Sequence, residues 1–100
     1  MPAGVLKVLP GARRDIREAE EWYWRSSPEA SDGFLVEVGR AFSLIKDAPD
    51  RWPLFRRGAR RFILERYPFS VVYRLDGFTV WVLAVAHAKR RPEYWRRRKP

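Results

Sequence analysis

The stretch Phe69-Ser-Val-Val-Tyr-Arg-Leu-Asp-Gly-Phe-Thr-Val-Trp-Val-Leu-Ala-Val-Ala-His87 decides the fold of this 100-residue chain. Apolar and polar side chains alternate on both sides of Asp76-Gly77, and a period of two is typical of half-buried β-strands. Asp-Gly between two such runs is the signal of a two-residue type I′ turn. The stretch therefore predicts a β-hairpin with strands over Phe69–Leu75 and Phe78–Ala86.

Taking Asp76-Gly77 as the loop fixes a register for the hairpin. The predicted pairs are Leu75 with Phe78, Tyr73 with Val80, Val71 with Val82 and Phe69 with Ala84. This face is almost wholly apolar, and we expect it to pack against helices. On the last strand the opposite face would carry Thr79, Trp81, Leu83, Val85 and His87.

Alternation also marks Arg60–Arg66 as a third strand, joined to the hairpin through Tyr67-Pro68. If that dipeptide is a two-residue connection, the pairs are Leu64 with Val71, Phe62 with Tyr73, Arg61 with Arg74 and Arg66 with His87. Two arginines that face each other repel unless an anion or a carboxylate joins them. We therefore expect an anionic site at Arg61 and Arg74.

The first half of the chain predicts a short strand and two helices. Val5–Leu9 is a strand candidate, and apolar residues at helical spacing predict a helix from about Ala12 to Arg25. Ser27 can cap a second helix that starts at Pro28 and stops near Asp47. The expected fold is α+β, one domain over residues 1–100 in the order β-α-α-β-β-β, with the helix hairpin packed on one face of the sheet.

Aromatic residues outside the strands are expected to serve packing. Trp22, Tyr23 and Trp24 follow one another near the end of the first helix, and core packing is the favoured role for all three. The loop Asp50–Gly58 should be pinned to the body of the protein by its aromatic side chains.

Composition disfavours several classes of function. The chain has no cysteine and one histidine, so neither a disulfide framework nor a thiolate or histidine metal cage is expected. No phosphate-cradling glycine loop, catalytic triad or carboxylate pair is apparent, and no cofactor is predicted. The N-terminus resembles neither a signal peptide nor a membrane span, so the chain is predicted to be cytoplasmic with no membrane partner.

Charge is concentrated in the second half. Residues 1–50 carry seven basic and nine acidic side chains, whereas residues 51–100 carry fourteen basic and three acidic ones, giving net charges of −2 and +11. The basic run after the last strand also contains Tyr94 and Trp95. This combination suits polyanions or an acidic protein partner. The alternative is that Tyr94 and Trp95 fold back onto the core while the arginines stay solvated.

His87, the only histidine, ends the last predicted strand. It could act as a general acid or base, or donate to a phosphate. The favoured alternative is a structural residue whose ring bonds a backbone carbonyl at the sheet edge.

The ordered set of segments resembles the RelE/ParE superfamily of bacterial toxins from type II toxin–antitoxin modules. The resemblance covers nearly the whole chain and rests on Val8–Ala12, Asp15-Ile16, Ser27–Ala30, Ala48-Pro49, Arg60–Phe62, Val71–Arg74 and Val82–Trp95. The ending with His87 and Pro92-Glu93-Tyr94-Trp95 looks closer to the ParE-like, plasmid-stabilisation branch.

The resemblance implies a toxin neutralised by a cognate antitoxin, as a homodimer or a hetero-oligomer with it. ParE-like members poison DNA gyrase, and this is the leading hypothesis. RelE-like members cut mRNA on the ribosome, which here would employ Arg61, Arg74, His87, Arg91 and Tyr94. That branch usually has a middle-strand arginine where Ser70 stands, which favours the gyrase hypothesis. A degenerate, non-toxic member that only binds antitoxin is a third possibility. The expected target- or antitoxin-binding residues are Arg61, Arg74, Trp81, His87, Lys89, Arg90, Arg91, Tyr94, Trp95 and Arg96.

We also expect that neutral residues in place of Arg90, Arg91 and Arg96–Arg98 would leave folding intact but weaken target binding.

Overall fold

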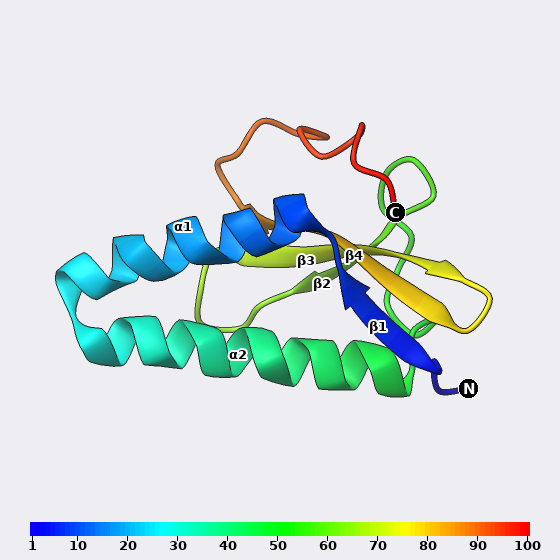
Figure 1. The fold of residues 1–100 in the computed structure, drawn as a ribbon, viewed down its shortest axis with the longest axis horizontal. Coiled ribbons are helices and arrows are strands. Elements are labelled where there is room, and N and C mark those ends of the chain that lie inside the picture. The colour runs from blue at the N-terminus through cyan, green and yellow to red at the C-terminus, as the bar shows by residue number, and fades with distance from the viewer.

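A computed structural model describes residues 1–100 as a four-stranded sheet with two helices on one face (Figure 1). The elements are β1 (Val5–Val8), α1 (Pro10–Ser26), α2 (Pro28–Asp47), β2 (Arg60–Ile63), β3 (Phe69–Asp76) and β4 (Thr79–His87). The strand order is β1-β4-β3-β2, with β1 parallel to β4 and the other pairs antiparallel. The α+β class and the order of elements predicted from the sequence are confirmed. None of the helices is long and apolar enough to cross a membrane.

Ser27 forms the corner of the helix hairpin. Its backbone N–H donates to the Tyr23 carbonyl at 2.9 Å and closes α1, while its side chain accepts from the Ala30 N–H at 3.0 Å and caps α2. Pro28 is the first residue of α2, as expected. Pro10 has the same place in α1, so that helix begins two residues earlier than the sequence pattern suggested.

The sheet carries an apolar cluster on each face. The first cluster lies under the helices and comprises Ala3, Ala12, Ala19, Phe34, Val38, Ala41, Ile45, Leu64, Phe69, Val71, Tyr73, Val80, Val82 and Val85. The second cluster lies on the opposite face and comprises Leu9, Ala59, Val72, Leu83, Ala84 and Trp95. The segment after β4, orange to red in Figure 1, therefore covers the face that the helices leave open.

The predicted hairpin register is wrong by two residues. Gly77 and Phe78 form the loop, and Asp76 stays in the ladder opposite Thr79. Only Gly77 has a positive φ, +60°, which matches a type II′ turn rather than type I′. The Asp-Gly signal shows that the glycine needs a left-handed backbone, but not whether it is the first or second central residue. Tyr73 consequently pairs with Val82 instead of Val80.

A β-bulge at Leu83 changes which face the end of β4 presents. Before it Tyr73 pairs with Val82, and after it Val72 pairs with Ala84. Because side chains alternate with a period of two, one extra residue moves all later side chains to the other face.

Three predicted placements fail for this reason. Val85 joins the cluster under the helices, and His87 pairs with Phe69 instead of lying on the opposite face. Ala84, predicted opposite Phe69, belongs to the second cluster.

The predicted pairing of β2 with β3 is also wrong. Arg61 lies opposite Val72 and not opposite Arg74, and Phe62 lies opposite Val71. The strand ends at Ile63, so Tyr67-Pro68 is not a two-residue turn and Arg66 does not face His87.

The reason lies in Tyr67, which packs on α2 instead of turning the chain. Its hydroxyl donates to the Ala30 carbonyl at 2.8 Å and sits against Gly33, where a Cβ would lie 2.5 Å from the hydroxyl oxygen.

Aromatic packing follows the prediction in the loop but only in part on α1. Trp52 and Phe55 are half-buried and pack against the core clusters. Tyr23 packs inward, but Trp22 and Trp24 are 65% and 60% exposed. Consecutive helical residues point about 100° apart, so only one of the three can face the core.

Candidate functional site

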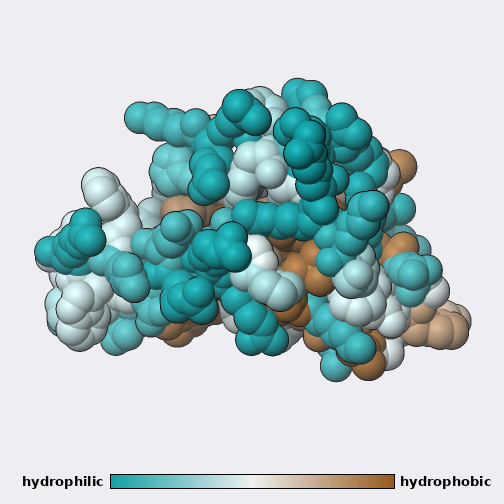
Figure 2. Space-filling view, turned by 45° about the horizontal axis from the view of Figure 1, so that its top comes forward, coloured by the Kyte–Doolittle hydropathy of each residue, from teal (hydrophilic) through white to brown (hydrophobic).

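A pocket of about 220 Å³ opens on the sheet face away from the helices. It lies between the loop that precedes β2 and the segment that follows β4. Its walls are formed by Phe55, Arg56, Arg61, Ser70, Val72, Ala86, His87, Ala88, Arg90, Arg91, Pro92, Glu93, Tyr94 and Trp95. Figure 2, in which the top of Figure 1 comes forward, shows this upper part of the molecule covered mostly by hydrophilic residues.

The pocket unites six of the ten residues expected to bind a target or antitoxin: Arg61, His87, Arg90, Arg91, Tyr94 and Trp95. The other four, Arg74, Trp81, Lys89 and Arg96, are not among its lining residues. Arg74 donates to the Arg57 carbonyl at 2.9 Å, and the ring of Trp81 lies 5.3 Å from the Lys7 ammonium. The expected anionic site between Arg61 and Arg74 is therefore not formed.

Three further residues line the pocket but were not predicted from the sequence to belong to the site: Phe55, Arg56 and Glu93. One available signal was Glu93, the only acidic residue after Asp76 in an otherwise basic run.

Three arginines in the pocket have no acidic partner. No carboxylate lies within 4.0 Å of the guanidinium groups of Arg61, Arg90 or Arg91. Arg61 instead lies 4.1 Å from the ring centroid of Phe55, and Arg90 lies 4.0 Å from that of Tyr94. These cation–π contacts orient the guanidinium groups without neutralising them.

Glu93 is the only carboxylate on the pocket wall, and it connects the C-terminal segment to the loop that precedes β2. It accepts from Arg57 Nε and, at 3.3 Å, from Arg56 Nη1. The hydrogen bond from Arg57 lowers the pKa of the Glu93 carboxyl. Glu93 and Arg57 both have a left-handed backbone, with φ of +61° and +54°. Such a conformation is unfavourable for these residue types, so the ion pair joins two strained positions.

His87 stands at the junction of β4 and the pocket. Its Nδ1 accepts the backbone N–H of Lys89 at 3.0 Å, which leaves Nε2 as the protonated nitrogen of the neutral ring. The ring meets Phe69 edge-on, with centroids 5.0 Å apart. His87 thus makes a backbone contact, as its structural alternative proposed, although the partner is an N–H and not a carbonyl.

Chemically, the pocket is suited to binding an anion. It offers guanidinium donors, one histidine and a single carboxylate that is already paired. No group of three or more histidine, cysteine, aspartate or glutamate side chains is placed to hold a metal ion.

The sequence matches a family model described as the ParE toxin of the type II toxin–antitoxin system parDE, over residues 6–92. The chain belongs to this ParE toxin family. A solved structure described as the chromosomal ParDE toxin–antitoxin system from P. aeruginosa superposes with a TM-score of 0.74 and 22% identity. The alignment covers 83% of this chain and 94% of that one, and it supports the fold. Comparison with curated proteins finds no match.

Membership of the ParE family makes the protein a toxin of a type II toxin–antitoxin system and implies an antitoxin partner. The family match ends at Pro92. It therefore does not extend to Glu93, Tyr94 and Trp95 on the pocket wall, or to Arg98 behind it. The roles of these residues must be argued from their contacts in this ParE toxin.

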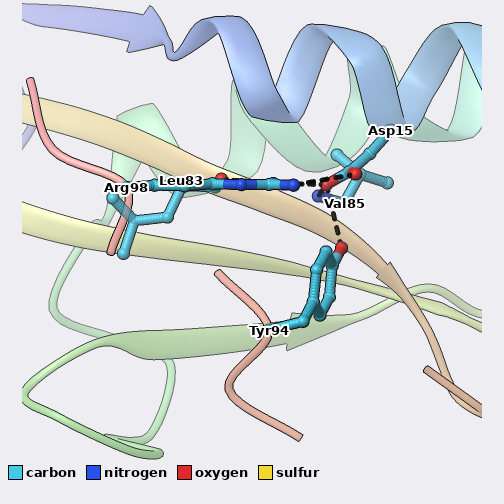
Figure 3. A network of polar contacts seen from close by, with 5 residues as sticks. All are labelled: Asp15, Leu83, Val85, Tyr94 and Arg98. Carbon is cyan, nitrogen blue, oxygen red and sulfur yellow. Dashed lines mark hydrogen bonds and ion pairs between the residues drawn. The ribbon is translucent and has the colours of Figure 1, made fainter. Parts of the chain in front are cut away.

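The C-terminal segment is anchored to the fold by a buried carboxylate, Asp15 of α1, which is 5% exposed (Figure 3). Asp15 Oδ2 accepts from the Val85 N–H at 3.1 Å, the Tyr94 hydroxyl at 2.9 Å and Arg98 Nη1 at 2.7 Å. Arg98 Nη1 also donates to the Leu83 carbonyl at 3.0 Å.

This network satisfies backbone groups of β4 that have no neighbouring strand. Pairing with β1 ends at Val82, whose carbonyl accepts from the Leu9 N–H. Beyond that point the side chains of Asp15 and Arg98 serve the N–H of Val85 and the carbonyl of Leu83. Buried polar backbone groups require such partners, so Arg98 has a structural role. This contradicts the expectation that all the tail arginines serve binding alone.

Gly11 makes room for this anchor. A Cβ at residue 11 would lie 2.5 Å from Arg98 Nε. Burial, then the charge of Asp15, raises the pKa of Tyr94, so its hydroxyl stays protonated as a donor. Burial disfavours the charged form of Arg98, but the hydrogen bonds that Arg98 donates to Asp15, the charge of Asp15 and the contact with Tyr94 together outweigh burial and raise the pKa of the guanidinium. Trp95, 2% exposed, fills the second cluster beside the network. For Tyr94 and Trp95, the alternative in which they fold back onto the core is confirmed.

Proposed function

We propose that this ParE-family toxin acts in the cytoplasm by inhibiting DNA gyrase and that a cognate antitoxin neutralises it. The observation that carries the proposal is the combination of family membership with a cationic rim formed by the exposed residues Lys89, Arg90 and Arg91. Unpaired positive charge of this kind favours association with an acidic protein surface. The same charge favours an acidic segment in the antitoxin.

The composition of the pocket argues against RNA cleavage as the main activity. Ser70 lies on the pocket wall at the strand position where the RNA-cleaving branch has an arginine. The Tyr94 hydroxyl is committed to Asp15 and holds its proton more tightly than usual, which makes it a poor general base. Arg74 lies outside the pocket.

Induced expression of the toxin with separate readouts tests the proposal. Expected results are growth arrest, broken chromosomal DNA and translation that continues at first. Purified toxin should inhibit supercoiling by gyrase, and a variant with glutamine at positions 90 and 91 should inhibit less while remaining folded. Early translation arrest with intact chromosomes would refute the gyrase target.

A ribosome-dependent mRNA endonuclease is the second candidate, because the pocket does unite Arg61, His87, Arg91 and Tyr94. In that case His87→Gln should abolish translation arrest while the variant keeps its fold. A third candidate, a non-toxic member that only binds antitoxin, predicts no arrest of either kind. In each case the test includes co-expression of the protein encoded beside the toxin gene, which should restore growth wherever growth has stopped.

A further inference from the structure

We propose that the pocket between the loop before β2 and the C-terminal segment binds a single phosphate group through Arg61, Arg90 and Arg91. The carboxylate of Glu93, on the wall of the same pocket, would oppose this binding. The proposal goes beyond the proposed function and does not depend on gyrase being the target.

The pocket wall carries an excess of positive charge. Four arginines line the pocket, Arg56 among them, against the single carboxylate of Glu93. Glu93 pairs with Arg56 and Arg57, so it neutralises none of the other three lining arginines. Like charges gathered in one partly enclosed space raise the local potential and attract an anion.

The arginine side chains of the pocket wall are donors that match the oxygens of a phosphate. Guanidinium groups present parallel N–H donors that fit two oxygens of a phosphate at once. The pocket volume of about 220 Å³ is many times the roughly 15 Å³ that one water molecule needs on the same measure, so the pocket has room for a phosphate and hydration waters. Ser70 adds a hydroxyl donor to the wall.

The aromatic side chains of the pocket are not available to stack on a base. Stacking of a base needs a free aromatic face. The ring of Tyr94 has Arg90 at 4.0 Å and Arg98 at 4.9 Å from its centroid, and Phe55 has Arg61 at 4.1 Å. Trp95 is buried. Because arginines already lie over the rings of Tyr94 and Phe55, and Trp95 is buried, binding should be independent of base identity.

The role of Glu93 follows from its position. Its carboxylate lies on the same wall as the three unpaired arginines, and it is held there by Arg56 and Arg57. A negative charge on the pocket wall repels an incoming anion, and it also occupies one lining arginine, Arg56. Removing that charge should therefore strengthen binding, whereas removing a charge from Arg61 should weaken it.

The experiment titrates the full-length protein with inorganic phosphate at constant ionic strength and follows amide shifts by NMR. Arg61→Gln should weaken binding roughly tenfold or more, the loss expected for a hydrogen bond to a charged group. Glu93→Gln should strengthen it roughly three- to tenfold. The matched control is Arg25→Gln, which removes the same charge at the far end of α1 and should change affinity by less than about twofold.

A second titration distinguishes free phosphate from the backbone of a nucleic acid. It uses short single-stranded oligonucleotides of two different sequences. Binding of either probe that depends on Arg61 supports the site, and equal affinity for the two sequences supports recognition without base contacts. The proposal is overturned if neither probe binds, if Arg25→Gln weakens binding as much as Arg61→Gln, or if Glu93→Gln weakens it. Circular dichroism of each variant confirms that it is folded, and Arg61→Lys provides a second variant that keeps the charge.

Discussion

Replacing Asp15 by asparagine should destabilise the protein strongly. The change keeps the shape of the side chain but removes the charge of a carboxylate whose side chain is 3% exposed and accepts four hydrogen bonds. Arg98 would then remain charged beside a neutral amide. The amide nitrogen, a donor, would also face other donors. In the place of Oδ2 it would meet the Val85 N–H, the Tyr94 hydroxyl and Arg98 Nη1, and in the place of Oδ1 it would meet Arg98 Nη2.

The magnitude follows from the environment of the pair. Removing one partner of a buried ion pair typically costs about 3–5 kcal/mol. The Arg98 side chain keeps 18% of its surface exposed and can turn toward water, so we expect the lower end, about 3 kcal/mol. For a domain of this size the melting temperature should fall by roughly 12–24 °C, since each kcal/mol shifts it by about 4–8 °C.

Urea and thermal denaturation followed by circular dichroism measure this loss. Asp32→Asn, on an exposed part of α2, is the matched control and should change stability by less than about 0.5 kcal/mol. A double-mutant cycle with Arg98→Met should show that the second change costs less once Asp15 is neutral. A loss below about 1 kcal/mol for Asp15→Asn would refute the structural role assigned to the pair.

Three further changes test other parts of the structure. Gly11→Ala should destabilise the protein, because the new Cβ would lie 2.5 Å from Arg98 Nε. In an Arg98→Ala background the same change should stabilise the protein by up to about 1 kcal/mol, since alanine has the higher helix propensity. Urea denaturation of the wild type, the two single variants and the double variant checks this reversal of sign. Trp95→Ala should cost about 3–5 kcal/mol, whereas Trp22→Ala, at a side chain 65% exposed, should leave the denaturation midpoint nearly unchanged. Burial raises the pKa of Tyr73 from 10.0 to about 12, so the folded state holds this proton more tightly than the unfolded state. The contribution of Tyr73 to stability should therefore be full below pH 10 and fall as the pH rises toward 12. Denaturation midpoints measured across this range should fall less in Tyr73→Phe.

Local signals in the sequence were sufficient for the order of elements. Ser27-Pro28 defines the corner between the helices because a cap and a fixed φ act within one turn of chain. Gly77 marks the hairpin for a similar reason, since its left-handed backbone is a property of one residue. The candidate site was found in part, because Arg61, His87 and the basic run are distinctive as residue types.

Properties that depend on distant partners could not be predicted in this way. The bulge at Leu83 exists where Asp15 and Arg98 supply hydrogen bonds to β4, and these two residues are 83 positions apart in the chain. Neither residue shows locally that it has a buried partner. The prediction that Arg61 faces Arg74 was wrong because it assumed a two-residue turn at Tyr67-Pro68. An error in register at one end of a strand shifts every pair along it.

The two apolar clusters on opposite faces of the sheet bear on how a lineage of such toxins loses its toxicity. The second cluster is small and includes two alanines, Ala59 and Ala84, each fully buried. A larger side chain at either position would displace Trp95 and dismantle the pocket, while the cluster under the helices stayed packed. Mutations that disrupt the pocket can therefore lie outside its lining residues, and a gene that carries one can still encode a folded protein with an intact helical face.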